Sequence, residues 1–410
     1  MIDCDAIARF LGSERLRQEA FLAALVRVAS DNPPGNCTPH AEHAARLLEG
    51  LGFSVERHPV SQALVDANGM RSVTNLVVRQ RFGANGPVIA LNAHGDVVPP
   101  GAGWTRDPYG SEIVDGWMYG RGAAVSKSDF ATYAWALLAL KVLKKPLRGS
   151  VELHFTYDEE AGGEIGPALL LREGISSPDL AIGAGFSYAV GTAHNGCLHL
   201  EVTVHGRSAH AALPGTGLDA LEAATAILTS LYQDRVRLAE LRSAVPGIGS
   251  PKLTVGLIEG GTNTNVVPDR VRFRLDRRII PEENPAVVEH DLGEKIAAAA
   301  SSFPDVRIEL RRILLATPLV PLAGGARLAE ILCGHASRVM GQPVATTGVP
   351  LYTDARHYAA CGVPVVLYGA GPHTIEEANA HRADERVPLA DLHKATEVVA
   401  LTLATLLDAT

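Results

Sequence analysis

The feature that most constrains the fold of this chain is a change of secondary-structure pattern near its middle. Before residue 190, short apolar strand patterns such as 74–78 and 88–92 alternate with helical patterns such as 130–142. Strands that are nearly continuous apolar runs, separated by helices, predict a layered α/β sheet with both faces covered. The same alternation resumes after residue 327, so we predict one discontinuous α/β domain.

The middle of the chain has the pattern of a smaller inserted domain. Residues 197–204 alternate apolar and mostly polar positions, as an antiparallel strand with one solvated face does. A helix, two strands, a helix and a strand follow, at 219–231, 253–258, 271–275, 285–300 and 306–310. This β-α-β-β-α-β order predicts a ferredoxin-like α+β fold. We therefore expect a first part of the large domain at 1–190, the insert at 191–312 and the second part at 313–410.

The composition excludes several classes of protein. A net charge of −8 over 410 residues argues against nucleic acid as a partner, because neutralising phosphates needs a basic surface. The apolar run 398–407 is shorter than the roughly 20 residues of a membrane span. The N-terminus has no basic stretch before an apolar core, so we expect no signal peptide. Five scattered cysteines without a C-x-x-C pair indicate reduced thiols in a cytoplasmic protein.

Two short polar motifs follow predicted strands, where α/β sheets commonly bind ligands. In the first, the Asp96 carboxylate can accept a hydrogen bond from one nitrogen of His94 and leave the other for a metal ion. In the second, Glu159 and Glu160 point in different directions, so one can bind a metal while the other acts as a general base. Each motif alone is equally consistent with an ordinary polar loop.

A series of motifs in a fixed order is much more specific than either pair. It comprises AHGDVVP (93–99), DGWMYGRGA (115–123), TYDEEAGG (156–163), GRSAHAALP (206–214), GGTNTNVVP (260–268), DRR (276–278), TDAR (353–356) and AHRADE (380–385). Across nearly the whole chain, this series resembles the metallopeptidase and deacylase family of acetylornithine deacetylase, succinyl-diaminopimelate desuccinylase, carboxypeptidase G and the aminoacylases. The resemblance implies hydrolysis of an amide (C–N) bond in a small N-acylated amino acid, dipeptide or related carboxylate. It also implies a homodimer formed through the insert.

The resemblance implies a role for each matching residue of the large domain. His94 resembles a ligand of one metal ion, and Asp96 the acid that orients it. Glu159 resembles the general base that takes a proton from the attacking water. Glu160 and His381 resemble ligands of a second metal ion.

Three residues of the insert also match. His210 resembles a histidine that reaches a partner subunit's site and stabilises the tetrahedral oxyanion. Asn265 and Arg278 resemble the groups that hold the substrate's carboxylate, for which arginine is geometrically suited.

Two positions depart from the family's pattern. The aspartate that bridges the two metal ions falls on Val125, because Lys127 is in register, and a further acidic ligand falls on Gly185. Of the five family ligands, three remain: His94, Glu160 and His381. We therefore expect no two-metal centre.

Three interpretations of the remaining site stay open. Two histidines and a carboxylate suit one zinc or iron ion, with cobalt and manganese as further candidates, and we favour such weak or single-metal binding. A metal-free pocket would instead keep Glu159 as a base on a metal-independent or non-hydrolytic enzyme. One of Glu159 and Glu160 would then hold a proton while the histidines pair with acids. The third interpretation is a catalytically silent homologue that only binds a small molecule.

The retained residues of the insert favour a working small-molecule site over a purely structural role. Asn265, Arg278 and His210 would have no purpose in a scaffold kept for dimerisation alone. Two other roles stay open, since Asp129 is a candidate replacement for the missing bridge and His373 a candidate surrogate ligand. Arg356 either adds to anion binding or braces Asp354.

Overall fold

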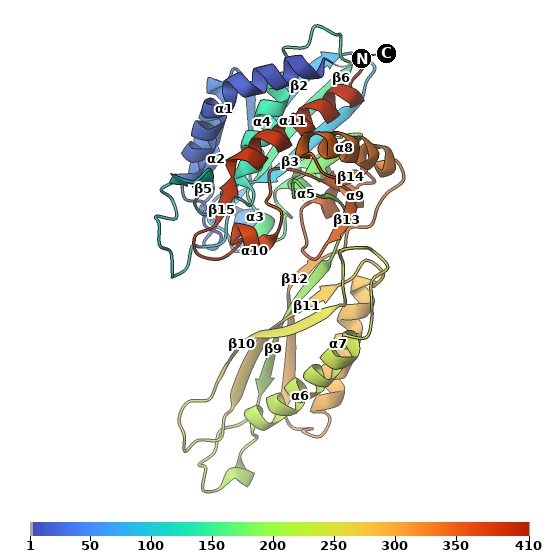
Figure 1. Ribbon diagram of the computed structural model, residues 1–410. Helices are drawn as coiled ribbons and strands as arrows, with labels where there is room; N and C mark the ends of the chain where they lie inside the picture. Colours follow the sequence, from blue (N-terminus) through green and yellow to red (C-terminus); the bar gives the residue numbers. More distant parts are fainter. Residues whose placement is uncertain (1–2, 410) are drawn as a thin grey trace. The chain divides into compact units, whose positions relative to one another are not determined.

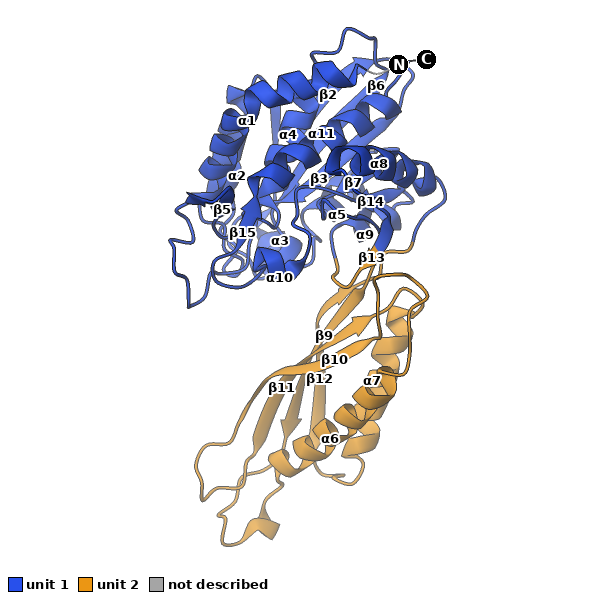
Figure 2. Ribbon diagram, in the orientation of Figure 1, with its two compact units in different colours: residues 1–192, 321–347, 353–410 blue, residues 193–320, 348–352 orange. Residues whose placement is uncertain are grey.

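The computed structural model describes residues 3–409 (Figure 1). The chain forms two compact units (Figure 2). Unit 1 contains residues 1–192, 321–347 and 353–410, and unit 2 contains residues 193–320 and 348–352. None of the helices formed by residues 3–409 combines the length and apolar character of a membrane span.

Unit 1 is built on an eight-stranded mixed sheet in the order β1-β2-β6-β3-β7-β14-β8-β13. The strands are β1 (Val55–Pro59), β2 (Thr74–Gly83), β3 (Val88–His94), β6 (Gly149–Thr156), β7 (Leu180–Gly183), β8 (Val190–His194), β13 (Thr346–Val349) and β14 (Val365–Leu367). Strands β6, β3, β7 and β14 run parallel to one another, and β2 is antiparallel to β6. The predicted layered α/β sheet is therefore confirmed, and its parallel strands end at one common edge.

Helices cover this sheet. They are α1 (Cys4–Val26), α2 (Thr38–Gly50), α3 (Gln62–Ala67), α4 (Lys127–Leu140), α5 (Pro167–Arg172), α8 (Gly325–Met340), α9 (Ala355–Ala360), α10 (Ile375–Ala378) and α11 (Leu389–Leu406). In Figure 1, α1, α4, α8 and α11 form one layer, in which α4 packs against α1 and α11. Helix α4 is apolar on nearly all sides and almost wholly buried, because it lies between the sheet and its neighbouring helices.

A small third sheet joins two segments of unit 1 that are far apart in the sequence. It has the order β15-β5-β4, with β4 (Ile113–Val114), β5 (Trp117–Tyr119) and β15 (Arg386–Pro388). Beside it, Arg121 Nη1 lies 2.5 Å from Glu385 Oε2. Both side chains are almost fully buried, so neither charge is compensated by water.

Unit 2 is a four-stranded antiparallel sheet in the order β10-β11-β9-β12, with two long helices on one face. Its elements are β9 (Gly196–His205), η2 (Pro214–Thr216), α6 (Ala220–Leu238), β10 (Lys252–Gly260), β11 (Arg270–Ile279), α7 (Pro285–Ala300) and β12 (Arg307–Ala316). This is the predicted ferredoxin-like arrangement. Leu198, Leu200, Val202 and Val204 alternate along β9 and form the core beneath the helices, and polar residues occupy the other face.

Strand β12 continues four residues past the predicted end of the insert at 312. The extra residues, 313–316, form the apolar run Ile-Leu-Leu-Ala, which has no alternation that marks it as a strand. A register shift in the β12–β9 pairing lies between Arg312 and Leu314, so the side-chain alternation is broken there in the structure as well.

We predict that Glu385→Ala destabilises unit 1 by about 3–5 kcal/mol, because it leaves the buried Arg121 charge without a partner. All three tryptophans lie in unit 1, so urea unfolding followed by tryptophan fluorescence reports on this unit. The exposed Glu376 on α10 is the matched control, and Glu376→Ala is expected to change stability by less than about 0.5 kcal/mol. Equal effects of the two substitutions would contradict the prediction.

Candidate active site

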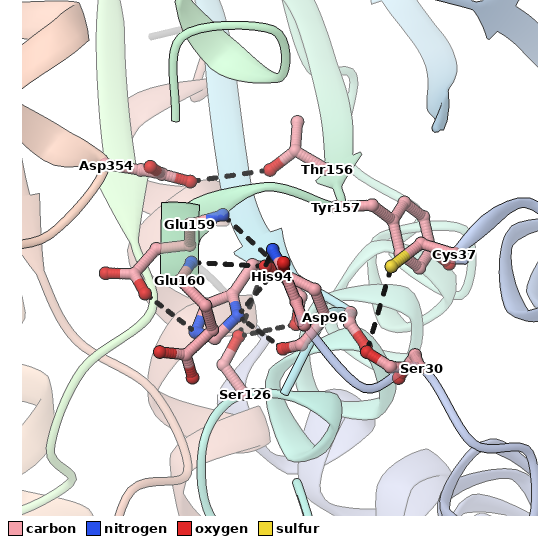
Figure 3. Close-up of polar contacts among 12 residues, drawn as sticks. Ser30, Cys37, His94, Asp96, Ser126, Thr156, Tyr157, Glu159, Glu160 and Asp354 are labelled. Carbon is pink, nitrogen blue, oxygen red and sulfur yellow. Dashed lines mark hydrogen bonds and ion pairs between the residues drawn. The ribbon is translucent and has the colours of Figure 1, made fainter. Parts of the chain in front are cut away.

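The two polar motifs of unit 1 meet because their strands are neighbours. His94 ends β3 and pairs with Thr156, which ends the adjacent parallel strand β6. Asp96 follows the first strand, and the 3-10 helix η1 (Glu159–Ala161) follows the second. The parallel strands thus bring His94, Asp96, Glu159 and Glu160 to one edge of the sheet, where α/β proteins commonly bind ligands (Figure 3).

Asp96 connects these segments. Its carboxylate is fully buried and accepts hydrogen bonds from the backbone N–H groups of Glu159 (3.2 Å to Oδ1) and Glu160 (3.1 Å to Oδ2). Oδ2 also accepts from Asn32 Nδ2 at 2.9 Å. The turn that carries Glu159 and Glu160, called the acidic turn below, is therefore held by the same side chain that lies beside His94.

The imidazole of His94 is held at one nitrogen. Its Nδ1 lies 2.9 Å from the backbone oxygen of Asp96 and 3.4 Å from Asp96 Oδ1. The other nitrogen, Nε2, lies 4.0 Å from Glu159 Oε2. The hydroxyl of Ser126 accepts from His94 N at 3.0 Å and donates to His94 O at 3.1 Å. Nε2 is thus the nitrogen of His94 that faces the acidic turn.

The two glutamates pair with different histidines. Glu159 faces His94, whereas Glu160 Oε1 lies 3.5 Å from Nε2 of His381, a half-exposed side chain between α10 and β15. One nitrogen or oxygen from each of His94, Glu159 and Glu160 lies within 4.8 Å of the others, a spacing that suits a single divalent ion. These donors therefore fit a metal ion, with His381 adjacent to them.

The pKa values of Glu159, His94 and His381 are shifted so that positive and negative charges nearly balance among these side chains. Burial raises the pKa of Glu159 to about 8; the charge of His94 opposes this rise, and Glu160 and Asp96 add to it. Burial lowers the pKa of His94, but the carboxylates of Glu159 and Asp96 outweigh it and bring the pKa well above its ordinary value. The hydrogen bond that His381 donates to the Glu160 carboxylate raises the pKa of His381. Protons thus occupy this group when no metal ion does.

The two departures from the family's pattern have distinct surroundings. The backbone N–H groups of Ala124 and Val125 point to Glu385 Oε1, at 3.1 and 3.4 Å. At Gly185, an added Cβ would lie 2.7 Å from Tyr368 N and 2.8 Å from Leu367 C. An acid at position 185 would therefore require the 367–368 segment to move.

Asp129 lies against the second of these positions. It is buried in the first turn of α4, and its Oδ1 accepts from the backbone N–H of Ala370 at 2.7 Å. The backbone N–H of Gly185 also donates to it. Burial raises the pKa of Asp129 to about 7, while these two hydrogen bonds and the charge of His94 oppose the rise. The carboxyl group of Asp129 on α4 thus lies next to Gly185, which has no side chain of its own.

Arg356 contacts the acidic turn. It is buried on α9, donates to the backbone oxygen of Gly162, and lies 3.7 Å from Glu164. His357 Nε2 lies 3.0 Å from the same oxygen. Of the two roles considered for Arg356, these contacts support a brace, although the braced segment is the turn after η1 rather than Asp354.

Asp354 lies near Glu159, and no role of its own was predicted for it from the sequence. It is buried, and its Oδ2 accepts from Thr156 Oγ1 at 3.5 Å. Burial and the charge of Glu159 raise its pKa well above the ordinary value. Its place in the TDAR motif was the signal that could have found it. His373 is exposed and packs on the ring of Tyr188, with 4.7 Å between ring centroids.

In unit 2, His210 and Asn265 lie next to each other. His210 forms an antiparallel bridge with Val266, and the backbone N–H of Ala211 donates to Asn265 O at 2.9 Å. Both side chains are exposed. The loops before α6 and between β10 and β11 therefore present these two residues together.

Arg278 is not near this pair within the unit. It lies at the far end of β11, eight positions from Arg270 at the loop end, roughly 26 Å at the usual rise of a strand. Its Nη2 and Nε donate to Asp276 Oδ2 at 3.0 and 3.1 Å. Asn265 and Arg278 of one chain therefore do not hold one carboxylate together.

Comparison with known proteins identifies the family. Residues 90–405 match the model of peptidase family M20/M25/M40. The chain belongs to this family. Acetylornithine deacetylase of Myxococcus xanthus is 29% identical over 370 residues, which is 89% of this chain and 91% of that protein. Succinyl-diaminopimelate desuccinylase of Cereibacter sphaeroides is 30% identical over 392 residues, 91% and 94% of the two chains.

The fold of this M20/M25/M40 family member is also found among solved structures. An M20 family metallo-carboxypeptidase from Sulfolobus solfataricus superposes with a TM-score of 0.76 and 16% identity, covering 95% of this chain and 98% of that one. The predicted family, fold class and enzyme class, a hydrolase of C–N bonds, are thus confirmed.

We predict that the affinity for manganese, a hard divalent ion, rises between about pH 6 and pH 8. The ion must displace the protons that the raised pKa values of Glu159 (about 8) and His94 retain. Isothermal titration calorimetry in two buffers of different ionisation enthalpy measures both the affinity and the proton release. Glu160→Gln should weaken binding at every pH. An affinity that stays constant over this range would contradict the predicted proton displacement.

Proposed function

We propose that this protein hydrolyses the amide bond of a small N-acylated amino acid or dipeptide that carries a free carboxylate. The observation that carries this proposal is Glu159, 14% of whose side chain is exposed, which the Asp96-bound turn holds beside His94. The names of the relatives, a deacetylase and a desuccinylase of amino acids, support the class of substrate.

We further propose that one divalent ion, zinc or else cobalt or manganese, is held by His94, Glu160 and His381. The bridging position offers only the aliphatic Val125, which argues against two ions. When bound, such an ion supplies Lewis-acid polarisation of the scissile carbonyl. The close spacing of His94, Glu159 and Glu160, together with the 3.5 Å contact between His381 and Glu160, supports a single ion at this turn.

The remaining chemistry falls to side chains of the protein. Glu159, as the base, takes a proton from the attacking water and passes it to the leaving amine. Asp96 keeps the imidazole of His94 and the acidic turn in a fixed orientation. His210 donates to the oxyanion of the tetrahedral intermediate, and Asn265 and Arg278 bind the carboxylate of the substrate.

The positions of these last residues support a homodimer formed through unit 2. His210 and Asn265 lie at one end of this unit and Arg278 at the other, so a site that uses all three draws on two protomers. All five cysteines are thiols, which supports the proposed cytoplasmic location.

The proposal predicts that Glu159→Gln lowers kcat by about 10²–10⁴-fold while substrate binding is retained. Glutamine keeps the shape of the side chain but accepts no proton. The measurements are steady-state hydrolysis of N-acetyl and N-succinyl amino acids, and calorimetric binding of the same compounds. Glu164→Gln, in the same loop but half-exposed, is the control and should leave kcat unchanged.

Two results would contradict this proposal. Full activity of Glu159→Gln would show that Glu159 is not the general base. A wild-type protein that binds these compounds but turns none over would be the silent homologue. Activity unchanged by a chelator would instead indicate the metal-independent enzyme. The proton retained by Glu159 and the ion pair between Glu160 and His381 are also compatible with a site that holds no metal ion.

A role for His210 in the partner's site predicts complementation between two inactive variants. Unfolding and refolding an equal mixture of Glu159→Gln and His210→Ala makes half of the dimers mixed, each with one complete site. The mixture should recover about one quarter of wild-type activity, whereas each variant alone stays inactive. No recovery, with mixed dimers shown by native mass spectrometry, would place His210 in the site of its own chain.

A further inference from the structure

A second group of metal-binding side chains lies in unit 2, away from the helices. Cys197 and His199 are two positions apart on β9, so they share one face of the sheet. On β11, Asp276 pairs with His199 and Arg278 pairs with Cys197. Because cross-strand partners lie on the same face, all four side chains gather on the polar face of the sheet.

The donor atoms of three of these side chains lie close together. Cys197 Sγ is 3.6 Å from Asp276 Oδ1, and His199 Nε2 is 3.3 Å from Asp276 Oδ2. All three groups offer a ligand atom within 4.8 Å of the others. In a tetrahedral zinc site with ligands at about 2.0–2.3 Å, neighbouring ligand atoms are roughly 3.3–3.6 Å apart. Cys197 and His199 each lie at such a separation from one oxygen of Asp276, which is Oδ1 for Cys197 and Oδ2 for His199.

We propose that Cys197, His199 and Asp276 bind one zinc ion, with water in the fourth coordination position. A thiolate, an imidazole and a carboxylate together are a donor set typical of zinc rather than of magnesium or calcium, which prefer oxygen alone. The ligands come from two adjacent strands whose backbones are hydrogen-bonded along their length, so their positions are fixed before the ion binds. Binding releases the proton of the Cys197 thiol.

Arg278 contacts the proposed ligand Asp276 without being a ligand itself. It donates to Asp276 Oδ2 through Nη2 and Nε, and leaves Oδ1 on the side of the thiol. Hydrogen bonds of this kind orient carboxylates that bind metals. The positive guanidinium opposes a cation, and the two negative charges of the thiolate and the carboxylate outweigh it.

The site is accessible to an ion from solvent. The side chains of His199 and Asp276 are 34% and 29% exposed, whereas Cys197 is buried beneath them. An ion can therefore enter from the open face of the sheet, and the thiol is shielded from oxidants. Without a metal ion, the same contacts form a hydrogen-bonded chain that orients Arg278, and this alternative is the one to exclude.

Cobalt(II) distinguishes the two possibilities because a thiolate ligand gives it an intense charge-transfer band in the near ultraviolet. The full-length protein, titrated with cobalt(II), should develop this band within two equivalents, one for each proposed site, and zinc should abolish it. Cys197→Ser should lose the band, whereas Cys333→Ser, at a partly buried thiol on α8, should keep it. His199→Gln, at a partly exposed position, should weaken cobalt binding at least about tenfold.

The readout separates this site from the proposed catalytic centre, because the ligand set of that centre contains no thiol. Glu160→Gln should therefore leave the band intact even if it abolishes activity. No band in the wild-type protein, or a band that persists in Cys197→Ser, would overturn the proposal. Loss of the band in Cys197→Ser with unchanged circular dichroism would exclude misfolding as the cause.

Discussion

The arrangement of His94, Glu159 and Glu160 at the edge of the sheet depends on one buried carboxylate. Asp96 has no contact with water, and it accepts from the backbone of both glutamates and from Asn32. A buried charge of this kind is tolerated only when donors and an opposite charge surround it. His94 supplies that charge, since the nearby carboxylates outweigh its burial and raise its pKa well above the ordinary value. One side chain thereby fixes the histidine and the acidic turn in a single geometry.

The same network shows how the carboxylates around His94 are accommodated next to Val125, where the resemblance leads one to expect a further acid. Replacement of a bridging acid by Val125 removes one negative charge from a group that is already crowded with carboxylates. Glu159 retains a proton near neutral pH, and Glu160 pairs with His381. Without a metal ion, the histidines and the retained protons therefore balance the charge of these carboxylates. Asp129 adds a protonatable carboxyl next to Gly185.

The sequence predicted those features that arise from local patterns, namely the main strands, the order of elements in unit 2 and the residues within contiguous motifs. It missed strands of two to four residues such as β4, β5 and β15, which are too short to show a period. It also left open contacts between distant segments, such as Asp129 with Ala370 and Arg356 with Gly162. Likewise, the approach of Cys197 and His199 to Asp276 follows from strand register, which no spacing in the sequence encodes.

We propose that the edge of the sheet with His94 and Glu160 retains Glu159 as its base and binds a single ion. Anomalous diffraction at the zinc edge, from crystals grown with zinc and without chelator, tests it most directly. One peak is expected in unit 1, within coordination distance of His94 and Glu160. Two peaks bridged by a shared ligand would contradict it, and so would the absence of any peak at this edge of the sheet.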